Sequence, residues 1–182
     1  MKVSLNLLLL VFGFSLCAQE KLVSTKVNDK ISLKIPQSFN SMTDGERIDK
    51  FVSSRTPLGV YTSEDRTIDL GINTNVMPWI KGDEEKLRSF YKGTYETLFT
   101  EVEYFQDTIK EINGKKFIVF EFLSTITEEN AISGSKTSRY YSYIQYTSYN
   151  NQILLFNFGC KPRKMRTWRP IAKEIMQSVR VK

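Results

Sequence analysis

Between Val102 and Cys160 the chain carries four strand-like runs in succession, with no helical pattern between them. Asn113–Gly114 separates the first two, and this dipeptide is a strong hairpin signal because a type I′ turn needs two residues that tolerate positive φ. Asn150–Asn151 marks a second turn, between the last two runs. Neighbouring strands joined by tight turns pair antiparallel. This region therefore predicts an antiparallel sheet, with a polar loop over residues 128–138 in its middle.

Two amphipathic helices are expected before and after this region. The first covers residues 82–102, and its stripe at helical spacing is Leu87, Phe90, Tyr91, Thr94, Leu98 and Val102. The second ends the chain, with a stripe of Trp168, Ile171, Ala172, Ile175, Met176 and Val179. Pro170 is expected in the first turn of that helix, because a proline further in would kink it. The order of elements predicts an α+β fold, with a central antiparallel sheet sandwiched by helices.

The N-terminal residues differ from the rest of the chain. A lysine at the second position, the apolar run Leu7–Phe14 and small residues up to Ala18 form the pattern of a secretory signal peptide. We therefore expect residues 1–18 to be a signal peptide and residues 19–182 to form a single domain. The protein is then exported, either periplasmic or secreted. The run Leu7–Phe14 is too short to span a bilayer, which disfavours a retained membrane anchor, and no other apolar run reaches the length required.

The two cysteines bear on anchoring and on redox chemistry. Acylation of Cys17 is a less favoured alternative, because Leu16 stands where a lipoprotein signal has a small residue. Cleavage of the signal peptide would leave Cys160 alone, so we expect no internal disulfide. Cys160 is interpreted as a small buried residue at the end of a strand rather than as a reactive thiol.

Positive charge is concentrated at the C-terminal end of a chain whose formal net charge is +6. Residues 161–182 contain eight basic residues and one acidic residue, Glu174. Such a segment can attract an anionic partner, for example a membrane surface, an acidic protein or a polysaccharide, or it can be a solvated helix face. We favour the solvated face. The candidate partner-binding residues are Arg163, Lys164, Arg166 and Arg169, and no nucleic acid partner is expected.

Several kinds of chemistry are missing from the sequence. It contains no histidine, which excludes His-based catalytic triads and imidazole metal ligands. No zinc cluster, calcium loop or phosphate-binding loop is present either. We therefore expect no catalytic residue, no metal and no cofactor. Glu121 lies in the apolar run "FIVFEFL", where burial would raise its pKa; the preferred alternative is an outward position or a pairing with Lys or Arg.

The tyrosine-rich strand allows two interpretations. Alternate residues of a strand share a face, so Tyr141, Tyr143 and Tyr149 lie on one side and Tyr140 on the other. The rings can belong to a central strand that is covered on both faces. They can instead line an open cleft that binds a ligand. We favour the core interpretation; in the cleft interpretation Tyr141, Tyr143 and Tyr149 are the ligand-binding residues, with Trp79 as a further candidate.

The segments "ISLKIPQSFNSM", "VYTSEDRTIDLGIN", "INGKKFIVFEF", "YYSYIQYTSYNNQILLFNFGC" and "WRPIAKEIMQSV" together resemble the PsbP/DcrB-like group. That group is typified by the extrinsic PsbP subunit of photosystem II. The resemblance covers nearly all of residues 19–182. It lies in the order of the elements and in the pattern of hydrophobic positions. It implies an αβα sandwich around an antiparallel sheet. It also implies an accessory or binding protein, of a kind that is often exported or lipid-anchored in bacteria.

Three functional hypotheses follow. The preferred one is a non-enzymatic exported module that binds a protein or an anionic envelope component, through the basic C-terminal segment and the loop Thr127–Thr137. The second is a small-molecule or glycan-binding protein that uses the tyrosine-lined cleft. The third is a carboxylate-dependent hydrolase that uses Glu121.

Overall fold

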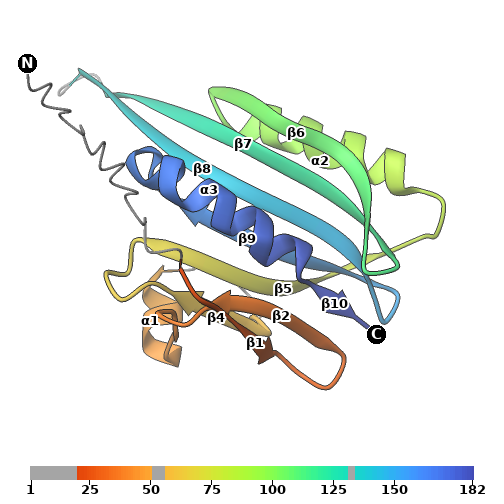
Figure 1. The fold of residues 1–182 in the computed structure, drawn as a ribbon. Coiled ribbons are helices and arrows are strands. Elements are labelled where there is room, and N and C mark those ends of the chain that lie inside the picture. Colours follow the sequence, from red (N-terminus) through yellow and green to blue (C-terminus); the bar gives the residue numbers. More distant parts are fainter. Residues whose placement is uncertain (1–19, 51–55, 131–133) are drawn as a thin grey trace, which may run out of the picture.

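The computed structural model describes residues 20–50, 56–130 and 134–182, and it contains two antiparallel sheets (Figure 1). The strands of the larger sheet are β3 (Asn40–Ser41), β4 (Gly59–Thr62), β5 (Ile68–Pro78), β6 (Glu101–Ile112), β7 (Lys115–Asn130), β8 (Gly134–Tyr149) and β9 (Gln152–Cys160). Their order in space is β3-β4-β5-β9-β8-β7-β6, and every neighbouring pair is antiparallel. The smaller sheet has the order β1-β2-β10, from β1 (Leu22–Lys26), β2 (Ile31–Pro36) and β10 (Arg180–Val181). The predicted central antiparallel sheet is thus confirmed.

Both predicted tight turns join the strands that the sequence indicated. Asn113 and Gly114, between β6 and β7, have φ values of 49° and 80°. Asn150 and Asn151, between β8 and β9, have φ values of 49° and 58°. Two successive residues at positive φ are the requirement of a type I′ turn, whose twist matches that of the flanking strands. These turns fix the pairing of β6 with β7 and of β8 with β9.

The predicted polar loop over residues 128–138 is wrong for most of its length. β7 runs to Asn130 and β8 begins at Gly134, and the register pairs Thr127 with Thr137. Hydrogen bonds between two strands can continue beyond the covered part of a sheet, because backbone pairing does not need apolar side chains. The proposed contact loop Thr127–Thr137 is therefore mainly a two-stranded extension. Residues 131–133 lie outside the described residues, as do the predicted signal peptide and Cys17.

Three helices complete the described structure: α1 (Asp44–Lys50), α2 (Glu84–Leu98) and α3 (Pro162–Gln177). α2 ends earlier than predicted, and Val102 belongs to β6. Its buried side is also rotated from the predicted stripe. Tyr91 and Tyr95 are buried, whereas Phe90 is 52% exposed and Leu98 is 64% exposed. The helix has two apolar stripes at helical spacing, and the sequence alone did not show which of them packs on the sheet.

The stripe of α3 is confirmed, but the start of the helix is not where it was predicted. Ala172, Ile175 and Met176 are buried, as expected. The helix begins at Pro162, which occupies the first turn, and Pro170 lies inside the helix. Proline is favoured at the first turn, where its missing N–H costs nothing, so the proline that marks the start is Pro162. Pro170 leaves the carbonyl of Arg166 without its usual intrahelical donor.

The large sheet is the middle layer of a sandwich, in a single domain. α3 lies on one side, where it contacts β8, β9 and β2, and α2 lies on the other side, where it contacts β6 and β7 (Figure 1). We call these sides the α3 face and the α2 face. The α3 face buries Phe117, Tyr141, Tyr143, Phe156 and Phe158, and the α2 face buries Ile118, Phe120, Phe122, Ile144 and Tyr146. In the described part of the chain, no helix combines the length and the hydrophobicity needed to cross a membrane.

Candidate functional site

The three tyrosines predicted to bind a ligand lie in two different environments. Tyr141 and Tyr143 are 0% and 1% exposed, within the core of the α3 face. Tyr149 is partly buried, and its hydroxyl accepts a hydrogen bond from Asn28 Nδ2 at 3.4 Å. Trp79 belongs to the hydrophobic cluster of the opposite, α2 face. A ligand for these residues would thus have to reach two fully buried rings, and their binding role stays a prediction.

Glu121 lies on the same face and is the centre of a polar cluster beneath α3. Its carboxylate is 0% exposed and accepts hydrogen bonds from Arg169, from Gln106 and from the Tyr141 hydroxyl, the last at 3.0 Å. Lys173 Nζ lies 3.7 Å from Oε2. We call Glu121 and these four partners the Glu121 cluster. It matches the predicted pairing with Lys or Arg and places both cations on α3.

The charge state of Glu121 follows from these contacts. Burial alone would raise its pKa, but the hydrogen bonds from Arg169, Gln106 and Tyr141 outweigh burial, and the pKa is lowered. The raised pKa that burial alone would give is therefore not found, and of the preferred alternatives the structure shows the pairing with Lys or Arg, whose cations α3 supplies. An ionised, enclosed carboxylate has no proton to donate at neutral pH, as a general acid would need to do.

The four predicted partner-binding residues divide into two pairs. Arg169 is part of the Glu121 cluster, and its guanidinium also lies 4.3 Å from the ring centroid of Phe105. Lys164 forms an ion pair with Asp65, and this hydrogen bond lowers the pKa of the Asp65 carboxyl. Arg163 and Arg166 are exposed. Arg169 and Lys164 thus bind α3 to the rest of the domain. Of the four residues, Arg163 and Arg166 are the two that present their charge outward.

A groove on the α2 face provides a site that the sequence analysis missed. It has a volume of about 640 Å³ and lies where α2 ends, since Phe99 directly follows that helix. Ile126 and Tyr140 also line it. We call it the Tyr140 groove. The alternation of β8 had placed Tyr140 on this face, but the prediction of two closed faces left no opening there.

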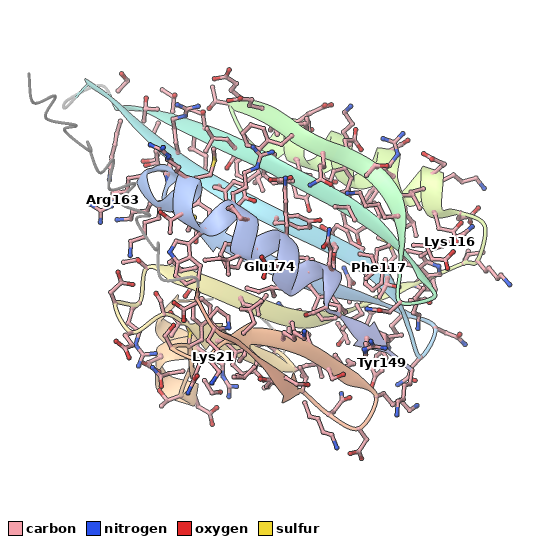
Figure 2. The ribbon with its side chains drawn as sticks, viewed as in Figure 1. Lys21, Lys116, Phe117, Tyr149, Arg163 and Glu174 are labelled. Carbon is pink, nitrogen blue, oxygen red and sulfur yellow. The ribbon has the colours of Figure 1, made fainter. Side chains whose placement is uncertain are left out.

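The rim of the Tyr140 groove is basic. Lys161, Pro162 and Arg163 line it from the first turn of α3, and Arg139 lines it from β8. Arg163 and Tyr149 lie at opposite ends of the molecule (Figure 2). The groove thus combines one tyrosine of the tyrosine-rich strand with one of the predicted partner-binding arginines, and it lies far from Tyr149.

Metal binding would need a cluster of ligand side chains among the described residues, and thiol chemistry would need a reactive cysteine. Within residues 20–50, 56–130 and 134–182, no group of three or more His, Cys, Asp or Glu side chains could hold a metal ion. Cys160 is a free, buried cysteine, and burial raises the pKa of its thiol to about 11. The thiolate that a nucleophilic cysteine needs is therefore disfavoured at neutral pH.

Comparison with solved structures identifies the architecture. The solution structure of cyanobacterial PsbP (CyanoP) from Synechocystis sp. PCC 6803 aligns with a TM-score of 0.61 at 11% identity, over 92% of this chain and 96% of that one. The chain has the PsbP-like fold. No family model matches the sequence, and neither does any curated protein. The likeness extends to architecture and not to any particular site.

Two further structures share this fold. The Ran-binding protein Mog1p of Saccharomyces cerevisiae aligns with a TM-score of 0.53 at 12% identity, over 89% of this chain and 96% of that one. LpqN of Mycobacterium tuberculosis, described as involved in cell envelope biogenesis, aligns with a TM-score of 0.50 at 12% identity, over 89% of this chain and 91% of that one. The PsbP-like fold thus occurs in proteins with unrelated biological settings, so function has to be argued from the site.

Proposed function

We propose that this protein is an exported, non-catalytic binding protein that contacts a protein or an anionic component of the cell envelope. The contact surface is the end of the domain where α3 begins. The observation that carries the proposal is the presence there of Arg163 and Arg166, both exposed, beside an open groove. Arg169 and Lys164 contribute indirectly, by holding α3 in place through Glu121 and Asp65.

A binding role without catalysis agrees with the chemistry of the described residues. Glu121 is ionised and enclosed, and the thiol of Cys160 has a raised pKa. The chain also contains no histidine. Mog1p, which has the same fold, is named a Ran-binding protein, so this architecture can present a protein-binding surface.

The export part of the proposal rests on the signal-peptide pattern of residues 1–18. Cell fractionation should find the protein in the periplasm or the medium, and N-terminal sequencing of that material should begin at residue 19. Retention in the cytoplasm with residues 1–18 attached would contradict export. Release of the protein only by detergent, with Cys17 at its N-terminus, would favour the lipid-anchored alternative.

The partner surface is tested by charge reversal and quantitative affinity capture from an envelope extract. The double variant Arg163→Glu with Arg166→Glu should lose the specific partners of the wild type. The matched control is Arg180→Glu with Lys182→Glu, which makes the same change in net charge at the C-terminus, where both residues are exposed. Identical partner profiles for the wild type and the Arg163 and Arg166 variant would refute the proposed surface.

A further inference from the structure

The chemistry of the Tyr140 groove is that of a small-molecule site. Its volume of about 640 Å³ lies within the range of about 300–1,000 Å³ that is typical of ligand pockets. Phe99, Ile126 and Tyr140 supply apolar surface, and the latter two are 39% and 38% exposed. Ser124, Ser138 and Ser142 add hydroxyl groups. Apolar walls with a few polar groups are the usual composition of a site that orients a small ligand.

The ring of Tyr140 lies against a glycine of the next strand, where the missing side chain leaves room for it. Gly159 of β9 pairs with Ser142 of β8, and the Tyr140 ring lies against it. A Cβ atom at position 159 would lie 2.9 Å from the Tyr140 hydroxyl oxygen and 3.0 Å from Cζ, and closer still to Cε1. Because these are the far atoms of a side chain, an alanine there would push the ring away from the strand. Gly159 thus sets the position of the aromatic surface.

The charged residues that line the groove are all basic. Lys161 and Arg163 line it from the start of α3. Arg139 lines it as well, but its Nη2 atom lies 3.8 Å from Glu103 Oε2, so part of its charge is balanced. None of the described residues that line the groove is acidic. A ligand with an anionic group would therefore be attracted to Lys161 and Arg163, and a cationic ligand would be repelled.

We propose that the Tyr140 groove binds a small amphiphilic anion, one molecule per protein. Its apolar body lies on Tyr140 and Ile126, and its carboxylate or phosphate group lies at Arg163 and Lys161. Arginine suits such a group, since its planar fork donates two parallel hydrogen bonds to carboxylate or phosphate oxygens. The inference rests on the proposed function, because it gives a ligand class to the same end of the domain.

Calorimetric titration of the purified protein tests the ligand class directly. The probes are decanoate and decyl phosphate, with decyltrimethylammonium as the probe of equal tail and opposite charge and inorganic phosphate as the head group alone. Both anionic amphiphiles should bind saturably at one site and raise the melting temperature. The cationic amphiphile and free phosphate should do neither. Equal binding of decyltrimethylammonium would overturn the proposal, because the basic rim would then play no part.

Three substitutions locate the binding. Gly159→Ala displaces the Tyr140 ring, and Arg163→Glu reverses the charge at the rim; each should weaken decyl phosphate binding by about tenfold or more. Ile126→Asp, at an exposed position, places a carboxylate on the groove wall and remains informative if Gly159→Ala fails to fold. Arg180→Glu is the matched control, because Arg180 is an exposed arginine that lies outside both the groove and the proposed partner surface. It should leave decyl phosphate affinity unchanged.

The outcomes separate this inference from the proposed function. Loss of amphiphile binding in Gly159→Ala, with partner capture unchanged, supports a ligand site next to the partner surface. If no anionic amphiphile binds the wild type, or if Gly159→Ala and Arg163→Glu bind it as the wild type does, the inference is wrong. In either of those cases the proposed function is still judged by the capture experiment, in which Arg166 takes part.

Discussion

On the α3 face, aliphatic and aromatic side chains surround an ionised carboxylate, whereas the α2 face buries mostly neutral rings. Glu121 has two cationic partners on α3. On the α2 face the central polar contact is a hydrogen bond between the hydroxyls of Tyr95 and Tyr146, and Tyr91 stacks on Tyr146 with ring centroids 4.0 Å apart. The α2 face is also less completely covered, since the Tyr140 groove opens beyond the end of α2.

Because of this difference, we link the α3 face mainly with the stability of the fold and the open part of the α2 face mainly with binding. Arg169 of α3 donates a directional hydrogen bond to Glu121, and Lys173 of the same helix pairs with it, so both contacts help to fix the position of α3 on the sheet. α2 is held by ring contacts, which tolerate a wider range of geometries, and by ion pairs of Arg88 and Lys92 with Asp107 of β6. The Asp107 carboxylate is less deeply buried than that of Glu121. We therefore expect substitutions in the Glu121 cluster to act mainly on the free energy of unfolding. Substitutions along the open part of the α2 face should act mainly on binding.

The largest effect is expected from Arg169→Ala. It leaves the fully buried carboxylate of Glu121 with Lys173, at 3.7 Å, as its remaining cation in the cluster. Removing one partner of a buried ion pair costs about 3–5 kcal/mol in the free energy of unfolding. Urea denaturation measures this cost. Arg166→Ala, an exposed arginine of the same helix, should change stability by less than about 0.5 kcal/mol.

The same cluster offers an internal control. Glu121→Leu combined with Arg169→Met removes both charges, and it should recover much of the stability that Arg169→Ala loses, because an apolar pair of similar volume often replaces a buried ion pair at little cost. A double variant as unstable as the single one would mean that Arg169 acts through its packing on Phe105 rather than through charge.

A pH-dependent effect should follow from the lowered pKa of Glu121. A carboxyl group whose pKa is lower in the folded state stabilises the fold above its unfolded pKa of about 4.3, and that stabilisation is lost as the pH falls through the folded value. The difference in unfolding free energy between the wild type and Glu121→Gln should therefore be constant near neutral pH and shrink below about pH 4. Denaturation curves at a series of pH values measure it. A difference that grows toward acid would contradict the direction of the shift.

A smaller effect is expected on the α2 face from Tyr146→Phe. It leaves the Tyr95 hydroxyl without its buried partner, at a cost of about 1–2 kcal/mol in the free energy of unfolding. Tyr91→Phe is the matched control, since the buried Tyr91 hydroxyl has no hydrogen-bond partner among the described residues. That variant should be neutral or slightly stabilising in the same urea experiment. Equal costs for both variants would show that the hydroxyl pair contributes nothing specific.

The smallest effect is expected from Phe90→Ala, on the outer side of α2. Phe90 is 52% exposed, so its loss should change the free energy of unfolding by less than about 0.5 kcal/mol. Tyr95→Ala, on the buried side of the same helix, should cost several times more. If Phe90→Ala were the more harmful of the two, α2 would lie on the sheet through the stripe that the sequence analysis had chosen.

The sequence was sufficient to predict the two hairpin turns and the apolar stripe of α3, because these features depend on residues that are close together in the chain. Asn113–Gly114 and Asn150–Asn151 indicated both hairpins, because few residues tolerate positive φ. The stripe of α3 was unambiguous, since a single set of apolar positions fits its helical period. α2 was ambiguous, because Phe90 and Leu98 continue the same period as well as the buried Tyr91 and Tyr95 do.

The candidate site was largely beyond prediction from the sequence. The partners of Glu121 are distant in the sequence, with Arg169 separated from it by 48 positions. The Tyr140 groove depends on where α2 stops and on how α3 leaves the end of β9, and neither feature has a local signature. Gly159 was a signal that could have been used, because a glycine inside a strand often marks the close approach of another group.

Asn113 carries a consequence for protein engineering. Besides forming the turn between β6 and β7, its side-chain amide donates hydrogen bonds to the carbonyl oxygens of Gln177, at 3.2 Å, and Val179, at 2.8 Å. Solvent-exposed tight turns are ordinarily chosen for epitope tags or for new chain termini in circular permutants. Here that choice would detach the C-terminal end of α3 from the hairpin, so a reporter sequence is better inserted elsewhere.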